Sequence, residues 1–333
     1  TAETVFGEVG TRLGSLMPAI PDGETGERLK WVGFFSEKLS EAKGLVLAGE
    51  IPFGGEVPQT LKFYKAAEGT DLSEVDLGST GYGEAAMDSY GDFVRSREAG
   101  NIPHGVRFQV SLPSPLVLAA FFHEPFDKRL PLVEKFMLRD VKEVLAAIPH
   151  EDLAIQWDLA FETESEEARR HPENAPPFMQ PDFPFESMIE ASARLFDAIP
   201  ADVLAGVHLC YGNPDGKHIV EPVDGSVMRD IMNALSKAVA RKLDWIHLPV
   251  PIDRHDDAFF VPFETLDIPA EIELYLGVVH EHDGVEGAAK RLAAAERFIG
   301  RKVGIATECG LGRRKPEQIP SLLDLHRQIA TQV

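Results

Sequence analysis

The sequence alternates short apolar runs with longer amphipathic stretches along most of its length. Each short run is rich in β-branched residues, which is typical of strands buried on both faces of a parallel sheet. The longer stretches repeat apolar residues with a helical period. Together they predict repeated βα units with right-handed crossovers. The expected strands are residues 44–48, 106–111, 154–158, 204–210, 245–250, 272–279 and 303–307, and the expected helices are 29–40, 85–98, 130–148, 185–198, 225–240, 284–299 and 319–331.

This pattern predicts a single (β/α)₈ TIM-type barrel over residues 1–333, with one further strand that is short or irregular near the N-terminus. A doubly wound open sheet is the alternative, but neither GxGxxG after a first strand nor GxxxxGK[ST] occurs. Segments 49–81 and 161–184 are expected to be long loops at the C-terminal face. The second is acidic and then proline-rich, which suggests a mobile flap or a surface loop without a catalytic role.

The charge balance excludes several classes of partner. The chain has 54 acidic and 33 basic residues and a net charge of −21, whereas nucleic-acid binders and proteins that adhere to anionic membranes need a basic face. No apolar run reaches the roughly 18–20 residues of a membrane span, and the first residues lack a signal-peptide pattern. Two cysteines do not make a disulfide scaffold and indicate a reducing, cytoplasmic setting. We expect a small-molecule substrate, and no heptad pattern indicates an oligomeric state.

Both cysteines lie at the ends of predicted strands. His208 and Cys210 end strand 204–210 and point the same way, because alternate residues of a strand share a face. Cys309 follows strand 303–307 and precedes a glycine-rich turn. The carboxyl ends of barrel strands surround the mouth in which barrel enzymes keep their active sites. One imidazole and two thiolates with an open fourth position match a catalytic zinc site, and a buried structural His–Cys pair is the alternative.

Three motifs, GVHLCYG (206–212), GVVHEHD (277–283) and ATECGLGRR (306–314), resemble the catalytic barrel of the cobalamin-independent methionine synthase family. The superfamily also contains uroporphyrinogen decarboxylase and the zinc alkyl-thiol transferases. The resemblance covers roughly residues 153–314. It implies a (β/α)₈ barrel that binds zinc through His208, Cys210 and Cys309, with His282 as a proton donor.

The resemblance also implies substrate contacts. Gln156-Trp157-Asp158-Leu159 is similar to the family strand whose aspartate, here Asp158, holds the substrate amino group. Gly14-Ser15 resembles an early Gly-Ser contact, which makes Ser15 a candidate. Gln156 and Glu308, which adjoin these motifs, are further substrate-binding candidates.

Some positions depart from the family pattern. Pro249 stands where methionine synthases have a glutamate as a fourth zinc ligand, so that either His247 substitutes or the site has three protein ligands. Leu159 replaces a substrate-binding glutamate, and His280 replaces the aspartate before the catalytic histidine. These changes argue against methionine synthase itself.

Other polar residues are candidates for substrate contact. Asp22, Glu24 and Arg28 form a dense polar turn, although acidic residues at the start of a helix account for part of this pattern. Gln109 is a candidate inside the strand 106–111.

The sequence therefore predicts a zinc-dependent methyl or alkyl transferase with a thiol acceptor. Coordination deprotonates a bound thiol, which then attacks a methyl or alkyl carbon near neutral pH. Asp158 would orient the substrate or donor, and His282 would protonate the leaving group. The alternative is a metal-assisted lyase or decarboxylase that acts on a small organic acid on the same barrel. A third possibility is a metal or corrinoid carrier without turnover.

Overall fold

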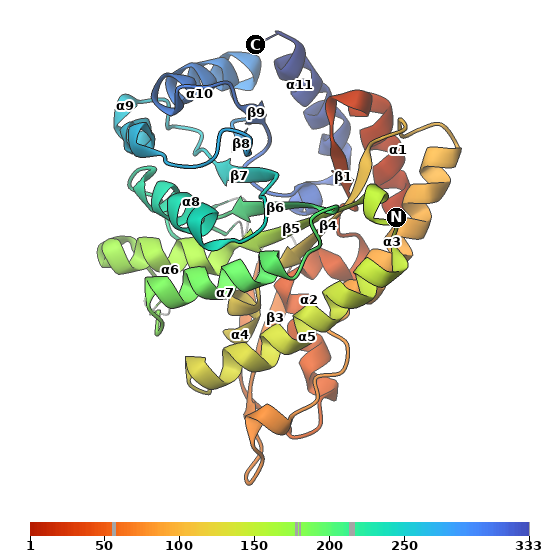
Figure 1. Cartoon of the computed structure of the whole chain (residues 1–333), viewed down its shortest axis with the longest axis vertical. Coiled ribbons are helices and arrows are strands. Elements are labelled where there is room, and N and C mark those ends of the chain that lie inside the picture. Colours follow the sequence, from red (N-terminus) through yellow and green to blue (C-terminus); the bar gives the residue numbers. More distant parts are fainter. Residues whose placement is uncertain (55–57, 177–178, 180, 213–216, 333) are drawn as a thin grey trace.

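A parallel sheet forms the centre of the molecule (Figure 1). The computed structural model describes residues 1–54, 58–176, 179, 181–212 and 217–332. Within these residues the sheet has seven strands, which lie side by side in chain order: β1 (Ala19–Pro21), β4 (Arg107–Pro113), β5 (Leu153–Leu159), β6 (Leu204–Leu209), β7 (Trp245–Pro249), β8 (Glu273–Gly277) and β9 (Gly304–Ile305). A separate two-stranded antiparallel sheet contains β2 (Leu45–Phe53) and β3 (Gln59–Ala66).

Helices connect and cover the strands. They are α1 (Ala2–Leu13), α2 (Val32–Lys38), α3 (Tyr82–Glu98), α4 (Pro115–Ala119), α5 (Phe126–Ala147), α6 (Ala160–Arg170), α7 (Phe185–Asp197), α8 (Ser226–Ala238), α9 (Asp257–Phe260), α10 (Gly284–Ile299) and α11 (Ile319–Gln332). Among the helices described here, none has both the length and the apolar character required to cross a membrane.

The sheet is curled, and helix α11 bridges its two edges. Helix α11 packs against both α1 and β9, while α1 also contacts β1 at the opposite edge. Figure 1 shows α11 beside α1. The expected α/β fold with a curled parallel sheet is therefore confirmed. The strand pairings among the described residues do not join β9 to β1, and they provide seven strands where eight were predicted.

The N-terminal part of the strand prediction needs correction. Residues 44–48 belong to β2, which pairs with β3 outside the central sheet. Val46, Leu47 and Ile51 of β2 are exposed, so this strand lacks the two buried faces that its apolar composition suggested. The short strand expected near the N-terminus is β1, which pairs in parallel with β4 through Ala19 and Arg107.

The acidic segment after β5 also differs from its prediction. Instead of an irregular mobile flap, residues 160–170 form helix α6. Its four glutamates, Glu162, Glu164, Glu166 and Glu167, are all buried. Glu166 lies one turn before two arginines and pairs with both of them, and this spacing stabilises the helix. Residues 177, 178 and 180 of the predicted flap lie outside the described residues.

Two glycines make room for aromatic side chains on neighbouring strands. A Cβ atom at Gly206 would lie 1.9 Å from Cε2 of Trp245, and one at Gly304 would lie 2.4 Å from Cδ1 of Tyr275. Each glycine is the register partner of the aromatic residue that covers it. The indole of Trp245 thereby reaches Gln156 on β5, to which Nε1 donates a hydrogen bond of 3.1 Å.

We predict that Gly206→Ala lowers the free energy of unfolding by about 1–3 kcal/mol, because the added methyl group overlaps the Trp245 ring. Chemical denaturation of both proteins measures the difference. Gly7→Ala in helix α1 is the control, since a Cβ there meets nothing within 4 Å. Equal stability of Gly206→Ala and the wild type would contradict the packing described here.

Candidate metal centre

His208, Cys210 and Cys309 meet at the carboxyl end of the central sheet. One ligand atom of each residue lies within 4.8 Å of those of the other two. His208 is in β6, Cys210 directly follows that strand, and Cys309 lies in the segment after β9. The two sulfur atoms are 3.9 Å apart. Residues that are 99 positions apart in the sequence thus form one group, as the parallel arrangement of their strands predicted.

The chemistry of this group suits a zinc ion. Both ring nitrogens of His208 are buried, and neither makes a well-aligned hydrogen bond to a described residue. Burial alone would lower the pKa of His208, but the neighbouring Cys309 and Asp158 outweigh burial and raise it. A metal ligand bond would offset the desolvation cost of this buried imidazole. One imidazole and two sulfurs are ligands that zinc prefers, and three protein ligands leave a position for a substrate.

His247 fixes the orientation of the His208 ring. The two rings stack with centroids 4.3 Å apart and planes 20° apart. Nε2 of His247 donates to the backbone carbonyl of Thr307 at 2.9 Å. Burial and the neighbouring His208 hold the pKa of His247 well below its usual range, so its ring is neutral. His247 is outside the group of three, and this favours three protein ligands over an arrangement in which His247 is a fourth.

The surroundings hold Cys210 in the thiol form. The adjacent sulfur of Cys309 and burial raise the pKa of Cys210 well above its usual value, and Glu164 and Asp158 add to this effect. A metal ion binds the thiolate form of cysteine, so metal binding at this group must release a proton.

Asp158 is oriented by a chain of hydrogen bonds that crosses the sheet. Its Oδ1 accepts a hydrogen bond of 2.9 Å from Nε2 of Gln156, while Oε1 of Gln156 accepts one from Trp245. Both polar atoms of the Gln156 amide therefore form hydrogen bonds within the protein. Gln156 was predicted to bind substrate, and its contacts here serve to orient Asp158.

The N-terminal polar turn lies beside the segment that follows Cys309. A Cβ at Gly312 would lie 4.0 Å from Oε2 of Glu24, whose backbone has a positive φ of 49°. Asp22 is 4% exposed and forms an ion pair with both terminal nitrogens of Arg28. Of these three predicted substrate contacts, Asp22 and Arg28 are therefore paired with each other, and Glu24 is the nearest to Gly312.

The remaining predicted residues lie as follows. Gln109 in β4 donates to Ser111 Oγ at 3.1 Å. His282 is exposed in the turn between β8 and α10, at the same end of the sheet as the cysteines. The side chain of Ser15 lies outside the described part of the structure.

The sequence analysis missed His218. Its Nε2 lies 3.4 Å from Oε1 of Glu308, and its Nδ1 lies 2.9 Å from Oε2 of Glu221. Burial alone would lower the pKa of His218, but the two carboxylates outweigh burial and raise it to about 9. The only indication in the sequence is a histidine in the loop directly after the GVHLCYG motif.

The analysis also missed Glu164, which belongs to the segment predicted as a flap. Its Oε1 lies within 2.5 Å of the position of a Cβ at Gly212, just beyond Cys210. Burial and Glu162 raise the pKa of Glu164 well above its usual value. The Glu–Arg spacing of residues 160–170 could have identified the helix.

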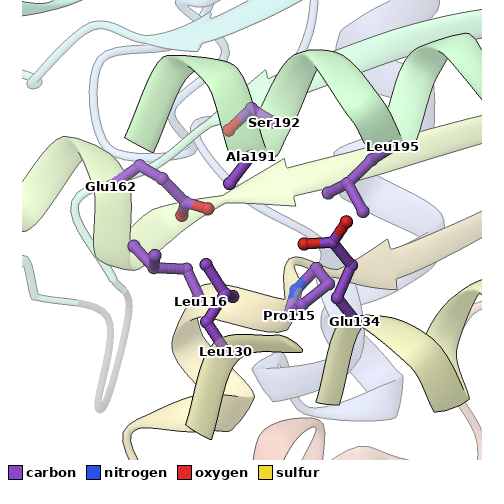
Figure 2. Close-up of a pocket in the computed structure, with 8 residues that line it drawn as sticks. All are labelled: Pro115, Leu116, Leu130, Glu134, Glu162, Ala191, Ser192 and Leu195. Atoms are coloured by element: carbon purple, nitrogen blue, oxygen red, sulfur yellow. The ribbon is translucent and has the colours of Figure 1, made fainter. Parts of the chain in front are cut away.

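A separate pocket lies in the helical layer, between α4, α5, α6 and α7 (Figure 2). Glu162 points into it, opposite Glu134 and beside Leu116 and Ser192. Burial raises the pKa of Glu162 to about 7, and among the described residues its Oε2 has no hydrogen-bond partner. None of the lining residues belongs to the cysteine group.

We predict that the His218 imidazole stays protonated through pH 8 and titrates near pH 9. Because this pKa is raised above the 6.5 of an unperturbed histidine, the interaction stabilises the folded protein fully below about pH 6.5. The stabilisation is lost as the pH rises through about 9. An NMR titration of the histidine resonances measures the pKa, with His218→Gln to assign the signal. A value at or below 6.5 would contradict the ion pairs.

Comparisons with known proteins support the fold. No family model matches the sequence, and no curated protein matches it. A B12-independent methionine synthase from Shewanella sp. W3-18-1, solved with selenomethionine, superposes with a TM-score of 0.57 at 16% identity, covering 94% of this chain and 81% of that chain. A Listeria monocytogenes protein assigned to the vitamin-B12-independent methionine synthases gives a TM-score of 0.57 at 14% identity, with 99% and 86% coverage. This chain therefore has the fold of B12-independent methionine synthase structures.

Proposed function

We propose that this chain is a zinc-dependent methyl or alkyl transferase of the methionine synthase-like type, with a small thiol as the acceptor. The observation that carries the proposal is the meeting of His208, Cys210 and Cys309 within 4.8 Å at the carboxyl end of the sheet. The fold likeness to B12-independent methionine synthases supports it. In this proposal residues 1–333 are one catalytic domain, a (β/α)₈ barrel with long loops around its mouth.

The three residues would hold a zinc ion, which lowers the pKa of a thiol that joins it and keeps that thiol nucleophilic near neutral pH. His208 binds through a ring whose orientation His247 fixes by stacking. Cys210 gives up the proton that its surroundings otherwise hold in place. A site with two thiolates requires a reducing compartment, and we therefore place the reaction in the cytoplasm.

The other residues would orient the reactants and move protons. Asp158, held by Gln156, presents a carboxylate beside the cysteine group and orients the substrate or donor. Glu24, Gln109 and Ser15 are further proposed substrate contacts. The acceptor sulfur takes the methyl or alkyl carbon, and the leaving group takes a proton from His282, for which an imidazole is well suited near neutral pH.

We predict about one zinc ion per chain in protein purified without chelator, as a single site of this kind holds. His208→Ala and Cys309→Ser each lose the metal and the activity, because each removes one of three ligands. Metal analysis by mass spectrometry measures the content, and His255→Ala, which changes an exposed histidine, is the control. A folded wild-type protein that binds no zinc, even when zinc is added, would contradict the proposed zinc-dependent mechanism.

We predict that product analysis will find an alkylated thiol, formed only when both a thiol and a methyl or alkyl donor are present. The metal-assisted lyase or decarboxylase is distinguished by the same measurement. Release of CO₂ or cleavage of a carbon–carbon bond without any thiol would contradict the transferase proposal. It would support the metal-assisted lyase or decarboxylase.

A further inference from the structure

An ion pair connects the two loops that carry the cysteines. His218 follows Cys210 by eight positions in the loop after β6, and Glu308 directly precedes Cys309 after β9. Their closest nitrogen and oxygen atoms are 3.4 Å apart. The side chains of His218 and Glu308 are only 10% and 24% exposed, so water and salt screen the pair less than a surface pair.

The described residues after β6, 210–212 and 217–223, are anchored to the end of that strand and to helix α6. The backbone N–H of Ile219 donates to the carbonyl of Tyr211 at 2.8 Å, which brings the chain back to the end of β6. Glu167 of α6 accepts hydrogen bonds from the Tyr211 hydroxyl at 3.3 Å and from the backbone N–H of Val223 at 3.0 Å. These hydrogen bonds hold the backbone next to His218 in place. Glu308 of the segment after β9 can therefore pair with a well-positioned imidazole.

Among the described residues, backbone pairing holds the segment that carries Cys309 as far as Ala306, whose N–H donates to the carbonyl of Leu276 at 2.8 Å and whose carbonyl accepts from Val279 at 3.0 Å. Strand β9 is only two residues long and pairs with β8 through Tyr275 and Leu276. Beyond Ala306, side chains hydrogen-bond the backbone of the segment: Nε2 of His247 donates to the carbonyl of Thr307, and Oγ1 of Thr307 donates to the carbonyl of Cys309 at 2.8 Å. Side-chain contacts such as that of Glu308 therefore matter for the position of the second sulfur.

Other charged groups face the pair, and they identify His218 as the cationic partner of Glu308. Nδ1 of His280 is 3.8 Å from Oε2 of Glu308, but the ring donates its proton from Nε2 to the carbonyl of Val250. Burial also lowers the pKa of His280, so its neutral ring has no proton to offer the carboxylate. Glu221, by contrast, is a second carboxylate on His218.

We propose that His218 and Glu308 are positioning residues that hold Cys309 against Cys210 and so form the metal-binding group before the metal arrives. The inference rests on the proposed function in one respect, namely that the group binds zinc. It gives Glu308 a different role from the predicted one, because the carboxylate acts through the neighbouring cysteine and not on the substrate.

The test measures zinc affinity by chelator competition for the wild type, Glu308→Gln, His218→Gln and the double variant. We expect each single variant to weaken zinc binding by about 10–100-fold, the range typical of residues that orient metal ligands. The double variant should be no weaker than the worse single variant, because both changes remove the same contact. In the cobalt-substituted protein, the thiolate-to-metal absorption should weaken in all three variants.

The two single variants also separate positioning from simple electrostatics. Removing the negative charge of Glu308 disfavours a cation, whereas removing the positive charge of His218 favours it, so a purely electrostatic effect moves the two affinities in opposite directions. Such a result would overturn the inference, as would affinities within twofold of the wild type. Glu286→Gln, which breaks a surface ion pair with Lys290, is the control, and thermal unfolding without metal checks that each variant folds. A wild type that binds no zinc would instead reject the proposed function.

Discussion

The parallel register of the central sheet determines where each group of the candidate metal centre lies. Neighbouring strands place Asp158, His208, His247, Tyr275 and Gly304 in one continuous row across β5 to β9. Residues in such a row point to the same side, which brings the two imidazoles into stacking contact and the carboxylate beside them. A shift of one residue in any strand would turn its side chain away from the site. The chemistry of the site therefore depends on hydrogen bonds between backbones.

Helix α6 shows how a strongly acidic segment becomes part of the interior. Each of the four buried glutamates has a separate arrangement: Glu162 lines the pocket in the helical layer, and Glu164 fits against Gly212. Glu166 pairs with two arginines, and Glu167 accepts hydrogen bonds from Tyr211 and Val223 after β6. Gly212 has a positive φ of 68° and no room for a Cβ, so the turn beyond Cys210 requires glycine. These contacts make the acidic helix a support for the candidate metal centre.

The sequence-based prediction was correct where the apolar or polar composition of a segment matches its burial in the fold. Strands β5 and β6 are buried on both faces, whereas β4, β7 and β8 alternate buried with less buried residues. The apolar composition of all five strands identified them. The grouping of His208 with Cys210 and Cys309 followed from their places at strand ends. The errors arose where the environment overrides composition: β2 is apolar but exposed, and α6 is acidic but buried. His218 was missed because its importance comes from Glu308, which is 90 positions away and becomes a neighbour only in the folded chain.

The shortness of strand β9 has a thermodynamic consequence. Backbone pairing at this edge extends only from Gly304 to Ala306 in the described structure, and helix α11, which packs on β9 and α1, depends on the same edge. A ligand that binds the folded state stabilises it by mass action, so the proposed zinc ion, shared between β6 and the segment after β9, would add its binding energy to that edge. In the proposed zinc protein, metal affinity and resistance of the C-terminal edge to local unfolding would therefore be two measures of one linked equilibrium.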